Sequence, residues 1–95
     1  MFAEGDVARV GGLTVIRAEG AAHGPEVGIV ASRKVGNAVT RNRAKRRVRE
    51  ALRHVELRPD SAYVVVTGQS TVTTAFERLV DDLRRAVVEV NEEQR

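Results

Sequence analysis

The sequence contains no cysteine, no tryptophan and only three aromatic residues, one tyrosine and two phenylalanines. The absence of cysteine excludes disulfides, thiolate nucleophiles and zinc sites that need sulfur, so stability must come from packing alone. With so few aromatics, the core has to be built from Val, Leu, Ile and Ala. We therefore expect a small aliphatic core.

Long hydrophobic runs are also absent, since no stretch approaches the roughly 18 apolar residues of a membrane span. The N-terminus has neither the basic region nor the apolar region of a secretory signal. A chain of 95 residues is too short to build two hydrophobic cores. The sequence thus predicts a single domain, residues 1–95, in the cytoplasm, with no membrane partner.

Charge of one sign is concentrated in one segment. Residues 33–58 hold ten Arg or Lys against Glu50 and Glu56, a local charge of +8, whereas the rest of the chain holds six basic and eleven acidic residues. The two parts, +8 and −5, add up to the net charge of +3. Such a concentrated cationic segment predicts a polyanionic partner.

Three segments have the pattern of strands. Residues 13–18 are rich in β-branched side chains and residues 27–31 alternate in polarity, with a loop containing Gly20, Gly24 and Pro25 between them. Residues 62–67 form a continuous apolar run, which is typical of a central strand covered on both faces or nearly so. Residues 1–12 have too few apolar positions to define an element.

Two further segments have helical periodicity. Apolar residues fall on one side of a helix over about residues 40–55, with Thr40 as the expected N-cap. Apolar residues also repeat at helical intervals over residues 76–90, behind Thr74 and Glu77, whose spacing is that of a capping box.

The order strand, strand, helix, strand, helix predicts an α+β fold. We expect a small sandwich in which both helices lie on one face of the sheet. The other sheet face is then open to solvent or to a ligand.

The first of these helices is dense in cations. Arg41, Lys45, Arg49 and Arg53 follow one another at four-residue steps, and between residues 41 and 53 arginine outnumbers lysine six to one. Like charges at this spacing repel by a few tenths of a kcal/mol per pair, and a bound polyanion relieves that repulsion. Because a guanidinium grips phosphate bidentately and stacks on bases, the pattern favours structured RNA over an ordinary solvated face.

The strongest motif is the segment from Arg33 to Glu50, RKVGNAVTRNRAKRRVRE, which closely resembles the signature of the bacterial ribonuclease P protein family. Residues 27–32 and 62–67 are similar to strands of that family, residues 76–83 to its last helix, and residues 2–5 to the end of its first helix. The resemblance implies a ribosomal protein S5 domain 2-like fold, a small α/β sandwich with a left-handed βαβ crossover. It also implies that the family's N-terminal helix is reduced or absent here.

In that family the Arg-Asn-Arg helix faces a catalytic RNA, and a cleft between sheet and helices holds the 5′ leader of precursor tRNA. The resemblance implies that this chain is the protein subunit of ribonuclease P, with ribonuclease P RNA and precursor tRNA as partners and no small-molecule substrate. The implied RNA-binding residues are Arg33, Lys34, Asn37, Arg41, Asn42, Arg43, Lys45, Arg46, Arg49 and Arg53. The implied leader-cleft residues are Phe2, Val15 and Arg17.

No set of residues points to an active site made of protein. The two histidines, His23 and His54, pair with no plausible nucleophile, and Glu77, Asp81 and Asp82 have the spacing of a solvated helix face. We therefore expect no catalytic residue and no metal ligand in this chain. The resemblance implies that magnesium ions, bound mainly by the RNA, carry out the hydrolysis, while the arginines screen phosphate repulsion and help position the leader.

Other interpretations stay open. A general RNA-binding or ribosomal-type protein without a ribozyme partner would carry the same basic helix. A protein-interaction domain would use the acidic last helix, and its affinity would depend far less on ionic strength than that of an RNA binder. A basic-region DNA reader is a poor match, because its helix must continue into a leucine heptad and Pro59 prevents this.

Overall fold

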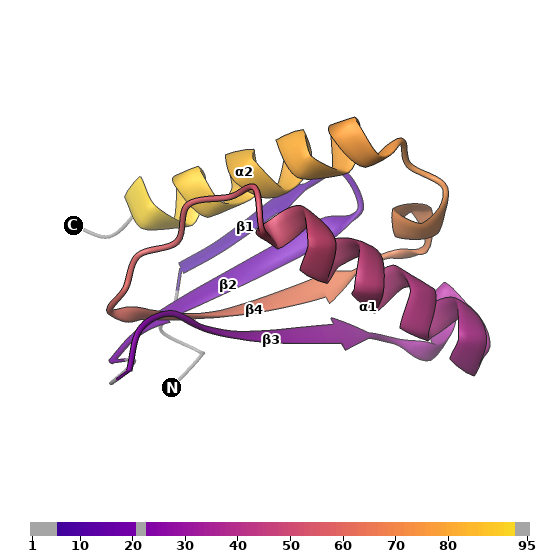
Figure 1. Cartoon of the computed structure of the whole chain (residues 1–95), viewed down its shortest axis with the longest axis horizontal. Helices are drawn as coiled ribbons and strands as arrows, with labels where there is room; N and C mark the ends of the chain where they lie inside the picture. Colours follow the sequence, from indigo (N-terminus) through magenta and orange to yellow (C-terminus); the bar gives the residue numbers. More distant parts are fainter. Residues whose placement is uncertain (1–5, 21–22, 93–95) are drawn as a thin grey trace.

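The structure is a computed structural model that describes residues 6–20 and 23–92. Four strands form one sheet in the order β1-β2-β4-β3, where β1 is Asp6–Val10, β2 is Leu13–Glu19, β3 is Glu26–Ala31 and β4 is Ser61–Thr67. The α-helices are α1 (Ala38–Leu52) and α2 (Phe76–Glu92), and the short 3-10 helices are η2 (Arg33–Val35) and η3 (Gln69–Val72). Both α-helices lie on the same face of the sheet (Figure 1).

The connection from β3 through α1 to β4 gives the fold its handedness. β3 and β4 are parallel neighbours, whereas β1, β2 and β4 pair antiparallel. In Figure 1 both β3 and β4 point to the right, β4 lies above β3 and α1 crosses in front, which makes the crossover left-handed. This is the rare sense for such a connection. The predicted α+β sandwich with a left-handed crossover is confirmed, and the prediction about the N-terminal helix lies outside the described residues.

The core lies between the sheet and the two helices. Val15 of β2 and Val65 of β4 are cross-strand partners, and both pack with Val48 of α1 and Leu83 of α2, each with 0% of its surface exposed. Burying an aliphatic side chain of this size stabilises a fold by about 1.5–3 kcal/mol. Tyr63 is the one aromatic among the fully buried residues that the structure describes. The small aliphatic core predicted from the composition is present.

Strand β1 corrects the prediction that residues 1–12 hold no element. Its inward positions include the charged Asp6 beside Ala8 and Val10, so the apolar alternation of a half-buried strand is broken. The hairpin to β2 turns at Gly11, which has a φ of +59°, a conformation that glycine adopts without steric cost. The adjacent pair Gly11-Gly12 is a hairpin signal in the sequence, and it indicates a strand directly before the strand at residues 13–18.

Strand β4 is central in the sheet, as predicted, but only one of its faces is fully covered. Tyr63 and Val65 point to the helices and are buried, whereas Ala62, Val64 and Val66 point the other way and are partly exposed. No helix within the described residues covers that second face. The second face is therefore less covered than the apolar run predicts, with its side chains only partly buried.

Helix α1 begins two residues earlier and ends three residues earlier than predicted. Its N-cap is Asn37, whose side-chain Oδ1 accepts a hydrogen bond of 2.9 Å from the backbone N–H of Thr40. Asn is as good an N-cap as Thr, so the sequence alone does not choose between them. At the other end the N–H groups of His54 and Val55 donate to carbonyls three residues back, which closes the helix in a tighter turn.

Candidate nucleic-acid interface

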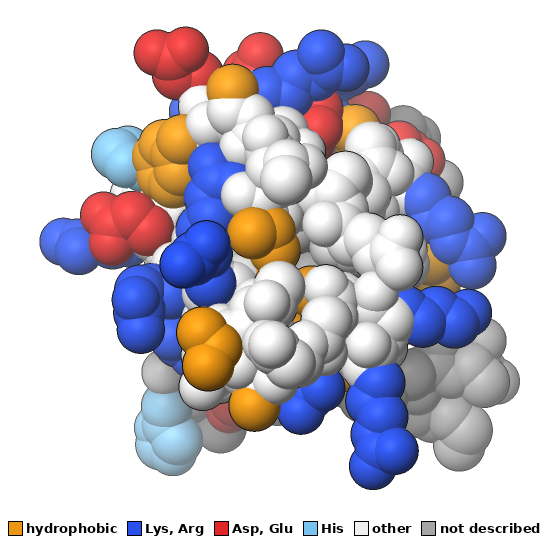
Figure 2. Space-filling view, turned by 90° about the vertical axis from the view of Figure 1, so that its right-hand side faces the viewer, with side chains coloured by type: hydrophobic (Ala, Val, Ile, Leu, Met, Phe, Trp, Pro, Cys, Tyr) orange, Lys and Arg blue, Asp and Glu red, His pale blue; other side chains and the backbone are white. Residues whose placement is uncertain are grey.

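Helix α1 is fixed to the sheet by small and aliphatic side chains. Ala44, Val48 and Ala51 are fully buried, and together they define the side of the helix that faces the core. At 100° per residue, the basic side chains fall on the rest of its circumference. Figure 2 looks at the end of the molecule where α1 begins, and Lys and Arg side chains line its left flank, while most acidic side chains lie at the top, over α2.

Most of the predicted RNA-binding cations are not engaged by the protein. Within the described residues, no side-chain hydrogen bond or ion pair occupies the following predicted residues: Arg33, Lys34, Asn42, Arg43, Lys45, Arg46 and Arg49. Arg53 pairs with Glu50 at 3.6 Å, but both side chains are largely exposed and such pairs contribute little. The structure therefore leaves a cationic surface on α1 and η2 with little internal neutralisation.

Two predicted RNA-binding residues have structural contacts of their own. Asn37 uses its side-chain oxygen to cap α1, and Arg41 donates from Nη1 to the carbonyl of Gly36 at 2.9 Å. Gly36 has a φ of +147°, and a Cβ there would lie 2.9 Å from the Cβ of Thr40, so the turn requires glycine. Arg41 keeps further N–H donors, so one hydrogen bond does not exclude a second contact.

Arg47 is on the same helix but has a different role. Its Nη1 donates to the carbonyl oxygens of Thr71 at 2.7 Å and Val72 at 2.9 Å, which connects α1 to η3. Charge-assisted hydrogen bonds of this kind are among the stronger ones in a protein. The charge pattern alone does not separate Arg47 from its neighbours, because the distinction depends on which segment packs beside the helix.

Two of the three positions predicted to line a leader cleft, Val15 and Arg17, are not on an accessible surface. Phe2 lies outside the described residues. Val15 is fully buried and Arg17 is 1% exposed, because both point toward the helices. Arg17 forms an ion pair of 3.8 Å with Asp6, its cross-strand partner on β1. Burial corrects the placement of Val15 and Arg17 in an open cleft, since they belong to the core.

The opposite face of the sheet is accessible and largely apolar. Side chains alternate along each strand, so the neighbours of the buried positions point away from the helices. Those that do so on the inner strands are Thr14, Ile16, Ala18, Ala62, Val64 and Val66, all partly exposed. The edge strands add Val7 and Val30, which are 41% and 47% exposed. A basic side chain, Arg9, stands at the β1 edge of this surface.

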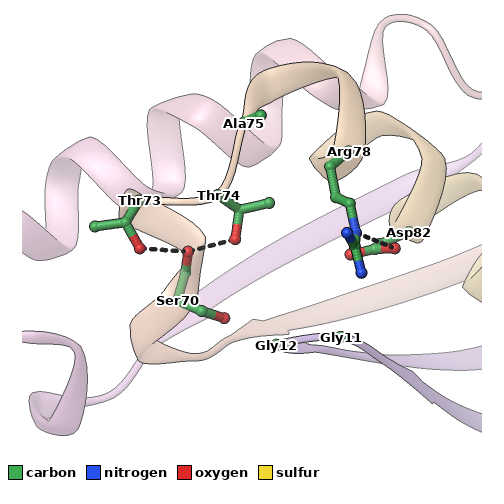
Figure 3. Close-up of a pocket in the computed structure, with 8 residues that line it drawn as sticks. All are labelled: Gly11, Gly12, Ser70, Thr73, Thr74, Ala75, Arg78 and Asp82. Atoms are coloured by element: carbon green, nitrogen blue, oxygen red, sulfur yellow. Dashed lines mark hydrogen bonds and ion pairs between the residues drawn. The ribbon is translucent and has the colours of Figure 1, made fainter.

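A separate pocket of about 510 Å³ lies where the β1–β2 hairpin meets the start of α2 (Figure 3). It contains none of the predicted RNA-binding residues. Asp82, predicted to be solvated, is only 7% exposed in this pocket and lies 4.0 Å from Arg78. Among the described residues no hydrogen bond joins Thr74 and Glu77, so the predicted capping box is not formed, and the Thr74 hydroxyl donates to the carbonyl of Ser70 at 2.6 Å.

The remaining titratable residues include the two histidines and the acidic side chains of α2. His23 and His54 are exposed, and the ring of His54 meets that of Phe76 edge-on with centroids 6.1 Å apart. No three His, Asp or Glu side chains of residues 6–20 and 23–92 gather as a metal site. Neither α-helix has the length and apolar character needed to span a bilayer.

The fold and this helix define a small basic α+β protein with a cationic crossover helix. The family model described as Ribonuclease P matches residues 1–91. The ribonuclease P protein component of Ruegeria pomeroyi is 52% identical over 75 residues, which cover 75% of this chain and 60% of that protein. That of Caulobacter vibrioides is 46% identical over 65 residues, 65% of this chain and 44% of that protein. The matches thus span 60% or less of these relatives' own lengths.

Solved structures show the same fold. The ribonuclease P protein of Thermotoga maritima superposes with a TM-score of 0.81 at 24% identity, covering 94% of this chain and 86% of that one. The protein from Staphylococcus aureus superposes with a TM-score of 0.77 at 22% identity, covering 96% and 84%. The chain belongs to the ribonuclease P protein family.

Proposed function

We propose that this chain is the protein subunit of ribonuclease P and acts in the cytoplasm. In this role it binds the catalytic RNA through α1 and η2, and it assists removal of the 5′ leader from precursor tRNA. The observation that carries the proposal is the set of exposed cations on α1, which have almost no acidic partner among the described residues. Family membership supports it, and the Arg-Asn-Arg segment, residues 41–43, lies near the start of that helix.

The arrangement suits a rigid phosphate-binding surface. Ala44, Val48 and Ala51 fix the helix to the core, and Arg47 ties it to η3, so the cations project from a frame that is ordered before RNA arrives. Preorganised charges cost less entropy to bind than charges on a mobile tail. Bound phosphates also release counterions, which adds to the affinity at low salt.

The open face of the sheet is the surface that we assign to the 5′ leader. A single-stranded leader presents bases as well as phosphates, and bases pack on apolar side chains. Ile16, Val64 and Val66 provide such a surface, and Arg9 at its edge supplies a cation for the backbone. This assignment replaces Val15 and Arg17, whose side chains are in the core.

In this proposal the protein contributes position and charge but no reacting group. Magnesium ions held mainly by the RNA supply the hydrolytic chemistry. The described residues of the chain offer no ligand cluster that fits a resident magnesium ion, so we assign no step of the reaction to a protein-bound metal. The arginines of α1 screen phosphate repulsion in the folded RNA, which lowers the magnesium concentration that the RNA needs.

Selective binding tests the proposal against a ribosomal-type role. The affinity of the chain for a ribonuclease P RNA is compared with its affinity for a ribosomal RNA fragment of equal length at the same salt. We expect tighter binding to the ribonuclease P RNA, lost in Arg46→Gln/Arg49→Gln. The matched control is Arg58→Gln/Arg85→Gln, which removes the same charge from exposed positions outside α1. Equal affinity for both RNAs, or equal loss in both variants, contradicts the proposal.

A further inference from the structure

A groove lies between α1 and the edge strand β3, beside the cationic surface described above. It encloses about 290 Å³ and is lined by Val27, Ile29, Arg49, Leu52 and Arg53. The groove is near the C-terminal end of α1, away from the Arg-Asn-Arg core. Phosphate binding by the exposed cations does not require such a hollow.

The chemistry of the groove is mixed in a specific way. The floor of the groove is aliphatic. Its Val27 remains 37% exposed even though the side chain points to the helix side of the sheet. Two guanidinium groups stand at its side, Arg49 with no partner among the described residues and Arg53 with only the exposed Glu50. A groove with an aliphatic floor and two guanidinium groups at its side fits a ligand that is flat and apolar in one part and anionic in another.

Edge strand β3 adds hydrogen-bonding groups to the same place. Within the described residues, β3 pairs only with β4, and the backbone N–H and C=O groups of its outer edge have no strand partner. Unpaired groups at a sheet edge are available to a ligand. A nucleobase has the donors and acceptors to use them, while its flat face covers the aliphatic side chains.

We propose that this groove holds one unpaired nucleotide of the RNA partner. The base packs over Val27 and Leu52, and the guanidinium of Arg49 stacks on it or binds its flanking phosphate together with Arg53. This inference rests on the proposed function, and it adds a contact with an unpaired base to the phosphate contacts proposed for α1. Proteins generally read RNA in this way, through unstacked bases rather than through the closed grooves of a duplex.

The charges favour RNA over the other occupants of a strand edge. A second copy of the chain pairing through β3 in a symmetric dimer would bring its own Arg49 and Arg53 close to the first pair, and like charges repel. A duplex would present phosphates to the aliphatic floor of the groove, and aliphatic side chains make no favourable contact with charged phosphates. An unpaired nucleotide satisfies both parts of the groove.

The test separates base packing from phosphate binding. The substitution Val27→Ser makes the floor of the groove less apolar without a change of charge. We expect the affinity for the ribonuclease P RNA to fall about fivefold. The slope of log affinity against log salt should stay unchanged, because no phosphate contact is lost. Val88→Ser, an exposed valine on α2 at 47% exposure, is the matched control and should bind as the unmodified chain does. Thermal unfolding of both variants verifies that each is folded.

A second measurement uses the unmodified protein. Ribonuclease P RNA that contains 4-thiouridine is cross-linked to the chain, and the attachment points are mapped by mass spectrometry and sequencing. We expect a cross-link between β3 or the last turn of α1 and one unpaired nucleotide. The inference is overturned if this region cross-links only to paired nucleotides. It is also overturned if the unmodified chain binds the RNA and Val27→Ser binds it as tightly as Val88→Ser does. A dimer of the unmodified chain that Val27→Ser dissociates also overturns it, in favour of a second copy. Absence of RNA binding by the unmodified chain refutes the proposed function itself.

Discussion

Arg17 and Asp6 are cross-strand partners on β2 and β1, and their side chains form an ion pair of 3.8 Å at the edge of the core. The Arg17 side chain is 1% exposed and its Nε has no hydrogen-bond partner among the described residues, whereas 24% of the Asp6 side chain is exposed. Among the described residues, Asp6 is the one carboxylate that pairs with this inward-facing arginine in the aliphatic core. The pair explains why a strand with a charged inward position is nevertheless stable next to β2.

Removing the carboxylate should cost more than removing both charges. We expect Asp6→Asn to lower the free energy of unfolding by about 2 kcal/mol, because it leaves a buried cation without its counter-charge. Arg17→Met, an apolar replacement of similar length, should cost less, and Asp6→Asn/Arg17→Met should match Arg17→Met alone. Urea denaturation measures all three. A double variant whose loss equals the sum of the two single losses would show that the pair is not coupled.

The contact of Arg47 with η3 predicts a stability effect that is separate from RNA binding. Arg47→Ala removes the donor for the carbonyls of Thr71 and Val72 and should lower the free energy of unfolding by about 1.5–3 kcal/mol. Arg46→Ala, one residue earlier and exposed, should leave stability within about 0.5 kcal/mol of the unmodified chain. Differential scanning calorimetry compares the two, and similar melting temperatures would speak against a structural role for Arg47.

Salt dependence distinguishes phosphate contacts from general charge. Arg46→Gln should reduce the slope of log affinity against log salt by about one, because one counterion-releasing contact is lost. Arg85→Gln removes the same charge from exposed α2 and should leave the slope unchanged. Filter binding to ribonuclease P RNA at several salt concentrations provides both values. The cationic surface of α1 is not the interface if the two variants give the same slope.

Asn37 combines a structural contact with a predicted role in RNA binding. Asn37→Ala should lower stability by about 1 kcal/mol through loss of the N-cap. Asn37→Asp keeps the cap and adds a negative charge, so it should retain stability while it weakens RNA binding if phosphate lies near. Circular dichroism melts and binding assays on the same samples separate the two effects. Unchanged RNA affinity in Asn37→Asp would remove Asn37 from the interface and leave it as a cap only.

The sequence predicts those parts of the molecule whose patterns are local. The two helices, three strands and the cationic stripe of α1 follow from periodicity and charge, and the motif from Arg33 to Glu50 indicates the family. The order of the strands and helices along the chain also predicts that both helices lie on one face of the sheet. These features depend on residues that are neighbours along the chain, which is why periodicity reveals them.

The features that sequence reasoning misses depend on contacts between distant segments. An arginine in a strand is normally expected to be exposed. The burial of Arg17 follows only from its pairing with Asp6, on a strand that was not predicted. Asp82 is enclosed because the β1–β2 hairpin packs on the start of α2 at Gly11. The groove beside Val27 likewise exists only because α1 crosses over an edge strand.

Release of the 5′ leader from precursor tRNA at low magnesium tests the central claim most directly. A bacterial ribonuclease P RNA is assayed alone, with the unmodified chain, and with the chain carrying Lys45→Gln, Arg46→Gln and Arg49→Gln together. We expect the unmodified chain to restore cleavage at a magnesium concentration where the RNA alone is inactive, and the triple variant not to restore it. Equal cleavage with and without the unmodified chain, at concentrations where it binds the RNA, would show that the chain does not assist removal of the leader.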